Sequence, residues 1–322
     1  MTTTTVAIVQ QPPSVLDRLE SVRRAASFVT ESADKDAQLV VFPESWLSGY
    51  PAWAFGLAGW RDAAGQALYA RLLAESAVLD HDGGLDDDLG PIRAAAREAG
   101  VTVSLGLNER ASRSSGSVFN SQILIGPTGH TLNLHRKLTP THTERIIWAP
   151  GDGAGLHVAD TPAGRVGGLI CWEHFSPLAR QALHAQNEEL HVAAWPDMTE
   201  AHSVAARSYA LEGRCFVISA AQILATTDLP TELLGAFRAG VGPGAPTEGF
   251  LFDGGSSIAA PDGSWALAPV HGQSGLLVVT LDLEDRYRES ADLDVAGHYA
   301  RPDVFTLAVD RTRRASGVTF SG

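Results

Sequence analysis

The chain has 322 residues, with 24 lysines and arginines against 37 aspartates and glutamates, so its formal net charge is −13. Such an acidic surface repels phosphate, which excludes nucleic acid and anionic membranes as expected partners, and no apolar stretch approaches the roughly 20 residues that cross a bilayer. The two cysteines, Cys171 and Cys215, are too few for a disulfide scaffold and fit a reduced, cytoplasmic protein.

Short β-branched runs alternate with segments of helical periodicity along the chain. The N-terminal MTTTTVAIVQQPP lacks the basic region of a secretory signal and leads straight into a strand. In chain order, strands are predicted over 6–10, 38–42, 101–107, 121–126, 130–135, 165–170, 190–195, 215–221, 256–261 and 275–283. Helices are predicted over 16–33, 92–99, 177–186 and 204–213. This order is typical of an α/β fold in layers with mixed sheets.

No internal repeat or linker divides the chain, so residues 1–284 are expected to form one domain. The Gly- and Pro-rich stretch 235–249 is interpreted as a long loop within that domain. From residue 285 the sequence turns polar and irregular, which predicts an extended C-terminal tail, 285–322, that contacts other subunits.

Glu44 is the first candidate for chemistry, in VVFPESWLSGYP. It follows a buried apolar strand, and α/β folds place ligands at the carboxyl ends of their strands. Partial desolvation there would raise the pKa of the carboxyl and suit it to general base catalysis. Taken alone, a carboxylate on an exposed loop is an equally good interpretation.

Lys137 and Glu144 form a second candidate pair, in HRKLTPTHTERIIWAPGDG. Lys137 follows a predicted strand, and Glu144 comes seven residues later. A lysine close to two carboxylates stays charged and can stabilise a developing anion. Taken alone, an exposed Lys–Glu pair of little energetic value is the favoured interpretation.

Cys171 ends the apolar strand of RVGGLICWEHFSPLAR and precedes a predicted helix. A thiol at such a strand-to-helix turn can meet backbone N–H groups that lower its pKa and bind an oxyanion, with Trp172 as the candidate donor. The alternative is an inert buried cysteine, which is how we interpret Cys215 in its apolar strand.

These three segments, in this order, resemble the nitrilase superfamily of carbon-nitrogen hydrolases. The likeness extends from VAIVQ to RPDVF, and CWEH, HRKLTPT and the tail DLDVAGHYARPDVFTLAVD resemble the true nitrilase branch. The resemblance implies a four-layer α-β-β-α sandwich with mixed β-sheets. It also implies a catalytic Glu44, Lys137 and Cys171, with Glu144 as the second glutamate of the family.

The implied activity is hydrolysis of an organic nitrile to the carboxylic acid and ammonia through a covalent thioimidate and thioester. This implied mechanism needs no metal or organic cofactor, and the 11 histidines are scattered and lack metal-ligand spacing. The resemblance further implies a homodimer that assembles into larger oligomers or helical filaments, with the tail against a neighbour.

Several aromatic and histidine side chains near these motifs are candidates for a substrate pocket. They are Tyr50, Trp53, Trp195 and His174, with His135 and His174 also candidates for a supporting role. The segment 51–76 carries few bulky side chains and is interpreted as a roomy pocket wall or an interface helix. The sequence leaves open whether the nitrile is aliphatic, arylaliphatic, aromatic or cyanide.

Three other functions compete with this interpretation. An amidase or carbamoylase of the same superfamily would use the same four residues. An inactive binding or self-assembling scaffold would not require the intact Glu-Lys-Glu-Cys set. A metal-dependent hydrolase would lose its activity with a chelator.

Overall fold

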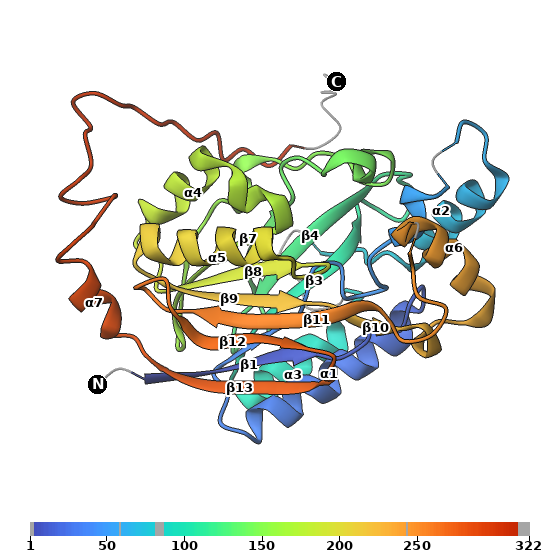
Figure 1. Cartoon of the computed structure of the whole chain (residues 1–322), viewed down its shortest axis with the longest axis horizontal. Helices are drawn as coiled ribbons and strands as arrows, with labels where there is room; N and C mark the ends of the chain where they lie inside the picture. Colours follow the sequence, from blue (N-terminus) through green and yellow to red (C-terminus); the bar gives the residue numbers. More distant parts are fainter. Residues whose placement is uncertain (1–2, 58, 81–86, 243, 315–322) are drawn as a thin grey trace.

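Two β-sheets lie face to face in the computed structural model, and helices cover the outer side of each sheet (Figure 1). The structure describes residues 3–57, 59–80, 87–242 and 244–314. The four-layer α-β-β-α sandwich with mixed sheets that the family resemblance implied is therefore confirmed.

The first sheet mixes parallel and antiparallel pairs. In spatial order its strands are β13 (Gly275–Asp282), β1 (Thr3–Gln10), β2 (Leu39–Val41), β3 (Thr102–Arg110), β4 (Val118–Ile125) and β5 (Thr131–Arg136). Strands β1, β2 and β3 run parallel, while β4 and β5 pair as an antiparallel hairpin.

The second sheet has a parallel centre of β7, β8 and β9. In spatial order its strands are β10 (Ile223–Ala225), β11 (Phe250–Ala259), β9 (Phe216–Ala221), β8 (Leu190–Trp195), β7 (Gly164–Ile170) and β6 (Ala159–Thr161), and β12 (Trp265–His271) pairs with β11. Strands β6, β10 and β12 were not predicted, because β6 and β10 are three residues long and β12 contains Pro269, which is unfavourable inside a strand.

Alternation of side chains along the strands builds the layers. In β1, Val6 and Ile8 enter the core between the sheets, while Ala7 and Val9 face the helical layer. That layer consists of α1 (Arg18–Ala33) and α3 (Gly90–Ala99), which lie below the first sheet in Figure 1. On the opposite side, α4 (Pro177–His184) and α5 (Glu200–Gly213) cover the second sheet.

Two further helices, α2 (Ala63–Glu75) and α6 (Thr231–Val241), lie together at one end of the molecule (Figure 1). Residues 235–241 belong to α6, so the prediction of a long loop over 235–249 is wrong for that part. Leu233 and Phe237, four residues apart, are buried and override the weak helix preference of the glycines. The helix ends at Gly242, whose φ is 100°.

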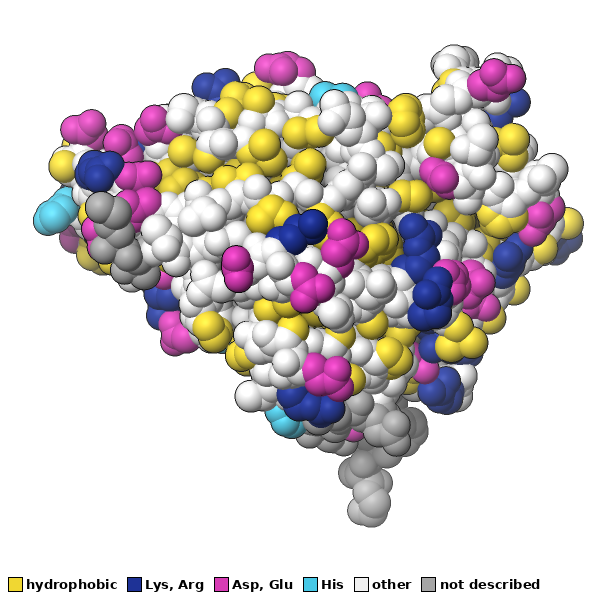
Figure 2. Space-filling model, turned by 90° about the horizontal axis from the view of Figure 1, so that it is seen from below, with side chains coloured by type: hydrophobic (Ala, Val, Ile, Leu, Met, Phe, Trp, Pro, Cys, Tyr) yellow, Lys and Arg dark blue, Asp and Glu magenta, His cyan; other side chains and the backbone are white. Residues whose placement is uncertain are grey.

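After β13, the chain forms α7 (Asp285–Glu289) and then, up to residue 314, has neither helix nor strand. Figure 1 shows this segment leaving α7 and passing outside α4. Acidic and basic side chains are mixed on the face seen from below in Figure 2. Among the residues described, none of the helices combines the length and apolar composition that a bilayer span requires.

Candidate active site

Glu44 lies directly after β2, in a turn that packs against β3. A side chain at Gly106 of β3 would place its Cβ 2.1 Å from the Pro43 carbonyl oxygen, so the turn can approach only a glycine. The Glu44 side chain is fully buried, and Asn120 Nδ2 donates a hydrogen bond to its Oε1 at 2.6 Å. The alternative of an exposed loop carboxylate is therefore wrong.

Lys137, which follows β5, joins two buried carboxylates. Its Nζ donates to Glu44 Oε1 at 2.9 Å and to Glu144 Oε2 at 2.8 Å. Glu144 lies in the 3-10 helix η2 (His142–Ile146), where the Thr141 N–H and the Tyr50 hydroxyl each donate to it at 2.6 Å. All of these charged groups are buried, so the alternative of a surface Lys–Glu pair is wrong as well.

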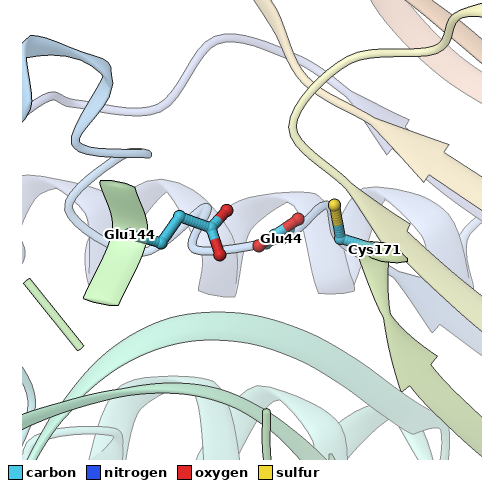
Figure 3. A group of neighbouring side chains, drawn as sticks. All are labelled: Glu44, Glu144 and Cys171. Carbon is cyan, nitrogen blue, oxygen red and sulfur yellow. The ribbon is translucent and has the colours of Figure 1, made fainter. Parts of the chain in front are cut away.

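Cys171 directly follows β7 and begins the 3-10 helix η4 (Cys171–Phe175), with α4 starting at Pro177. Its φ of 55° is left-handed, as in a sharp turn between strand and helix. Its sulfur and one carboxylate oxygen each of Glu44 and Glu144 all lie within 4.8 Å of one another (Figure 3). The backbone N–H of Trp172, the predicted donor, lowers the pKa of the Cys171 thiol.

Burial and neighbouring charges set the proton affinities of this group. Burial raises the pKa of Glu44 to about 7; Lys137 opposes the shift, and Glu144 adds to it. Burial lowers the pKa of Lys137, but the surrounding Cys171, Glu44 and Glu144 outweigh it and raise the pKa above its ordinary value. Burial and Glu44 raise the pKa of the Cys171 thiol, while Lys137 and the Trp172 N–H act against them.

The arrangement suits proton transfer between the thiol and Glu44. Glu44 Oε2 is buried and has no hydrogen-bond partner among the described residues, so it is free to accept a proton. A carboxyl with a pKa near 7 can both accept and return a proton at neutral pH. Lys137 stays positively charged beside any anion that forms at the thiol or on a bound substrate.

Glu44, Glu144 and Cys171 are also close enough to ligate one metal ion. The ammonium of Lys137, however, already bridges the two carboxylates and would repel a second cation in the same space. The donor set therefore fits an ion-pair network better than a metal centre.

A cavity of about 450 Å³ opens onto Cys171. Its lining is largely apolar and aromatic, with a few polar side chains: Tyr50, Phe55, Trp172, Leu251 and Phe252, together with Thr141, Asp197 and His202. Of the residues described in the segment 51–76, only Ala52 and Phe55 of the 3-10 helix η1 (Ala52–Phe55) contribute, and α2 does not. The cavity is large enough for a small organic molecule whose reacting carbon meets the sulfur.

Tyr50 lines this cavity, but three of the predicted pocket residues do not. Trp195 is fully buried between His174 and His202, with ring centroids 4.7 and 4.5 Å away. His174 is buried behind the nucleophile, and Trp53 faces a separate cavity beside α2. The prediction that these three side chains line the substrate pocket is therefore corrected, because the sequence places them near the motifs but not on the cavity side.

Two supporting residues escaped the sequence analysis. Asn120 in β4 lies opposite Lys137 and belongs to no motif, so only the hairpin pairing brings it to Glu44. Glu173 could have been noticed beside the nucleophile: its Oε2 accepts from the Ile170 N–H and its Oε1 from the Leu138 N–H. It also contacts His135 Nε2 at 2.8 Å, so His135 does support the site.

Comparison with known sequences finds similarity to carbon-nitrogen hydrolases. The model of the carbon-nitrogen hydrolase family matches residues 5–288. An aliphatic nitrilase from Rhodococcus rhodochrous is 35% identical over 98% of this chain and 81% of its own length. An arylacetonitrilase from Aspergillus niger is 34% identical over 95% of this chain and 91% of its own length.

Solved structures of low sequence identity share the fold. Nit3 from Saccharomyces cerevisiae, a member of branch 10 of the nitrilase superfamily, is 17% identical, with a TM-score of 0.69 over 94% of this chain and 97% of its own. An amidase from Nesterenkonia sp. AN1 is 19% identical, with a TM-score of 0.61 over 90% and 97% of the two chains. With a family model that spans nearly the whole sequence, this chain belongs to the carbon-nitrogen hydrolase family.

Proposed function

We propose that this enzyme is a nitrilase, which hydrolyses an organic nitrile to the carboxylic acid and ammonia. The observation that carries the proposal is the buried Glu44–Lys137–Glu144 network, with Cys171 beside it at the base of a largely apolar cavity. Relatives named as nitrilases, at 34–35% identity over nearly the whole chain, support the same activity.

In the first step, Glu44 takes the thiol proton and the Cys171 sulfur attacks the nitrile carbon. A carbon–sulfur bond forms, and one π pair of the triple bond moves to the nitrogen. The Lys137 ammonium and the Trp172 N–H stabilise this developing anion. Glu44 then returns its proton to the nitrogen, which gives a neutral thioimidate.

Two water molecules complete the reaction. The first, deprotonated by Glu44, adds to the thioimidate carbon, and ammonia leaves to give a thioester. The second hydrolyses the thioester, releases the carboxylic acid and restores the thiol. Glu144 orients Lys137 and is itself held by Tyr50 and the Thr141 N–H. If the tetrahedral intermediate expels the thiol instead of ammonia, an amide is formed.

Ammonia release from matched nitriles and amides tests the activity. We expect release from nitriles to exceed release from the corresponding amides; the reverse would indicate an amidase or carbamoylase, and no turnover of either would indicate a scaffold. A chelator is expected to leave the rate unchanged, because Lys137 occupies the space between the carboxylates.

A pair of cysteine variants tests the nucleophile. Cys171→Ala should abolish turnover and the covalent adduct seen by intact-protein mass spectrometry. Cys215→Ala is the matched control, because Cys215 is buried in the core beneath α5 and should leave turnover nearly unchanged. Nitrile hydrolysis by the Cys171→Ala enzyme would refute the mechanism.

The cavity suggests which nitriles to compare. Tyr50, Phe55, Trp172 and Phe252 offer aromatic surface to the part of the substrate that carries the nitrile group. We therefore expect phenylacetonitrile and benzonitrile to be turned over with higher kcat/KM than cyanide or a short dinitrile, because these fill less of the cavity.

We further propose that the chain acts in the cytoplasm as a homodimer that assembles into larger oligomers or helical filaments. Both cysteines are free thiols, which suits a reducing compartment. Large apolar side chains are exposed on α4, on α5 and in the tail, where a partner could cover them: Leu178, Val204, Leu211, Tyr299 and Phe305.

A further inference from the structure

A row of buried polar side chains leads from the nucleophile into the second sheet, on the side away from the cavity. His174 Nδ1 lies 2.7 Å from the carbonyl oxygen of Cys171, and His174 Nε2 lies 2.9 Å from His191 Nε2. His191 Nδ1 in turn lies 2.9 Å from Glu188 Oε2. Each of the three side chains is at most 1% exposed.

The partners of this row dictate where its protons are. The Cys171 carbonyl can only accept, so His174 Nδ1 carries a hydrogen. Glu188 accepts from the Tyr209 hydroxyl on Oε1 and from His191 Nδ1 on Oε2. Although burial opposes it, the neighbouring His191 and His184 hold the pKa of Glu188 at about 2, so this carboxyl is ionised.

The contact between the two Nε2 atoms requires one hydrogen between them. The two rings therefore share three protons and carry one positive charge beside the Glu188 carboxylate. The charge is placed on His191 by contact, because its Nδ1 lies against the Glu188 carboxylate, whereas His174 Nδ1 faces an uncharged carbonyl oxygen. His174 is then neutral, with its single hydrogen held on Nδ1 because His191 donates to its Nε2.

The hydrogen on His174 Nδ1 is donated to the peptide group that joins Cys171 to Trp172. The Cys171 carbonyl, which His174 Nδ1 contacts, and the Trp172 N–H belong to the same peptide unit, and that N–H lowers the pKa of the thiol. A donor on the carbonyl polarises the amide and makes its N–H a better donor. It also fixes the plane of a peptide that follows a left-handed residue, since the φ of Cys171 is 55°.

We propose that His174 is a positioning residue: held in one tautomer by His191 and Glu188, it orients and polarises the Cys171–Trp172 peptide so that its N–H stabilises the charge that develops in the reaction. This inference rests on the proposed thiol mechanism. His174 does not touch the cavity, so it acts through the backbone rather than on the substrate.

A purely structural role must be separated from this one, because the His174 ring also packs against aromatic side chains. Its centroid lies 4.7 Å from that of Trp195 and 5.7 Å from that of Tyr209. His174→Phe keeps the ring and removes both nitrogens. His174→Asn loses the ring, but its amide nitrogen can occupy the place of Nδ1 and still donate to the Cys171 carbonyl.

Kinetics of these two variants test the proposal. His174→Phe should lower kcat by about 10- to 100-fold, less than the loss of an oxyanion donor itself, with KM within about 3-fold of the wild-type value. Alkylation of Cys171 by iodoacetamide should slow in parallel, since the Trp172 N–H also stabilises the thiolate. His174→Asn should recover kcat to within about 5-fold of wild type, although its core packing is worse.

A His174→Phe enzyme with kcat near the wild-type value would overturn the proposal, and so would a folded His174→Asn enzyme that is no better than His174→Phe. Nitrogen-15 NMR of histidine-labelled wild-type enzyme keeps the test decisive if the variants fail to fold. His174 protonated at Nδ1 alone and His191 at both nitrogens is expected; His174 protonated at Nε2 alone would refute the arrangement. Alkylation and NMR need no nitrile, so they separate this failure from failure of the proposed function.

Discussion

The charge of Glu44 changes near neutral pH, because burial raises the pKa of its carboxyl to about 7. As the base that takes the thiol proton, Glu44 must be ionised in the free enzyme. We therefore expect kcat/KM for a nitrile to rise with pH as Glu44 loses its proton, with a midpoint near 7. A pH profile of initial rates measures this midpoint, which belongs to the coupled Glu44–Cys171–Lys137 group as a whole.

Removal of the Asn120 amide should shift the midpoint of this pH profile in a known direction. Its amide donates to Glu44 Oε1 at 2.6 Å, which favours the ionised carboxylate and lowers the pKa. Asn120→Ala should therefore move the acid limb of the profile to higher pH. Asn133→Ala is the matched control, because Asn133 donates only to the Gly155 and His157 carbonyls and should leave the midpoint in place. An unchanged midpoint in Asn120→Ala would argue against Glu44 as the titrating base.

Lys137 is expected to serve stability as well as catalysis. Its removal in Lys137→Met leaves the carboxyls of Glu44 and Glu144 buried without their shared cation. We expect the free energy of unfolding in urea to fall by about 3–5 kcal/mol at neutral pH, as for other broken buried ion pairs. Turnover should fall by at least about 10²-fold, since charge stabilisation at the reacting nitrogen is lost.

Two comparisons make this prediction specific. Lys35, the other lysine of the sequence, forms a loose surface pair with Glu31 at 3.9 Å, so Lys35→Met should change stability by less than about 1 kcal/mol. Adding Glu144→Gln to Lys137→Met removes one of the two uncompensated charges and should recover part of the stability without recovering activity. A Lys137→Met protein as stable as wild type would show that the carboxyls are neutral without the lysine.

Between elements, Glu173 ties the strand that ends at the nucleophile to the strand that ends at Lys137. One oxygen accepts from the Ile170 N–H and the other from the Leu138 N–H. Glutamine has a single acceptor oxygen, so Glu173→Gln must leave one of these buried N–H groups facing an amide donor. We expect a loss of about 1–3 kcal/mol in the free energy of unfolding.

The same change should affect catalysis, because Glu173 accepts hydrogen bonds from the residues next to Cys171 and Lys137 in the chain. We expect kcat to fall more than KM rises. Glu20→Gln is a suitable control, since Glu20 is an exposed partner of Arg23 on α1 and should alter neither stability nor rate. If Glu173→Gln kept wild-type stability and kcat, the carboxylate would not be what couples the two strands.

The elements themselves were predictable wherever one physical signal dominated. Predominantly apolar runs marked β2, β7 and β8; all residues of β2 and β8 are buried, and most of the apolar residues of β7 are. Prediction failed where distant contacts decide. Residues 235–241 read as a loop by their glycines, yet Leu233 and Phe237 bury against η1 and hold α6.

The residues of the site were likewise predicted only where a local sequence signal marks them. Glu44, Lys137, Glu144 and Cys171 were found because each lies in a motif, and the structure brings all four together. Asn120 was missed because β4–β5 pairing, not sequence distance, places it there. A supporting role for His174 was predicted, but its tautomer was not, since that depends on contacts with His191 and Glu188. A motif identifies reacting groups, whereas the groups that orient them are set by packing.

At the scale of the whole molecule, the tail from residue 285 combines a local anchor with exposed apolar side chains. Arg313 Nη1 contacts Asp152 at 3.1 Å, which fastens the far end of the described tail beside the loop after Lys137. Between α7 and this anchor, Tyr299, Val304 and Phe305 are mostly exposed. Exposed aromatic and aliphatic groups in an extended segment are better explained by a neighbouring subunit than by the chain's own core.

Two variants distinguish the role of the apolar segment of the tail from that of the Arg313 anchor. A chain ending at residue 289 loses the apolar segment and should form smaller assemblies by light scattering, with the cavity and its four charged or reactive residues left in place. Arg313→Ala removes the contacts of this side chain with Asp152 and with the Leu134 carbonyl, but leaves the apolar segment in place, and should keep the wild-type assembly size. If the shortened chain assembled as fully as wild type, subunit contacts would lie instead on the exposed faces of α4 and α5, where Leu178 and Val204 offer the alternative surface. The tail contacts the loop after Lys137 through Arg313. A fall in kcat that both variants share would therefore result from loss of this contact and not from a change in assembly size.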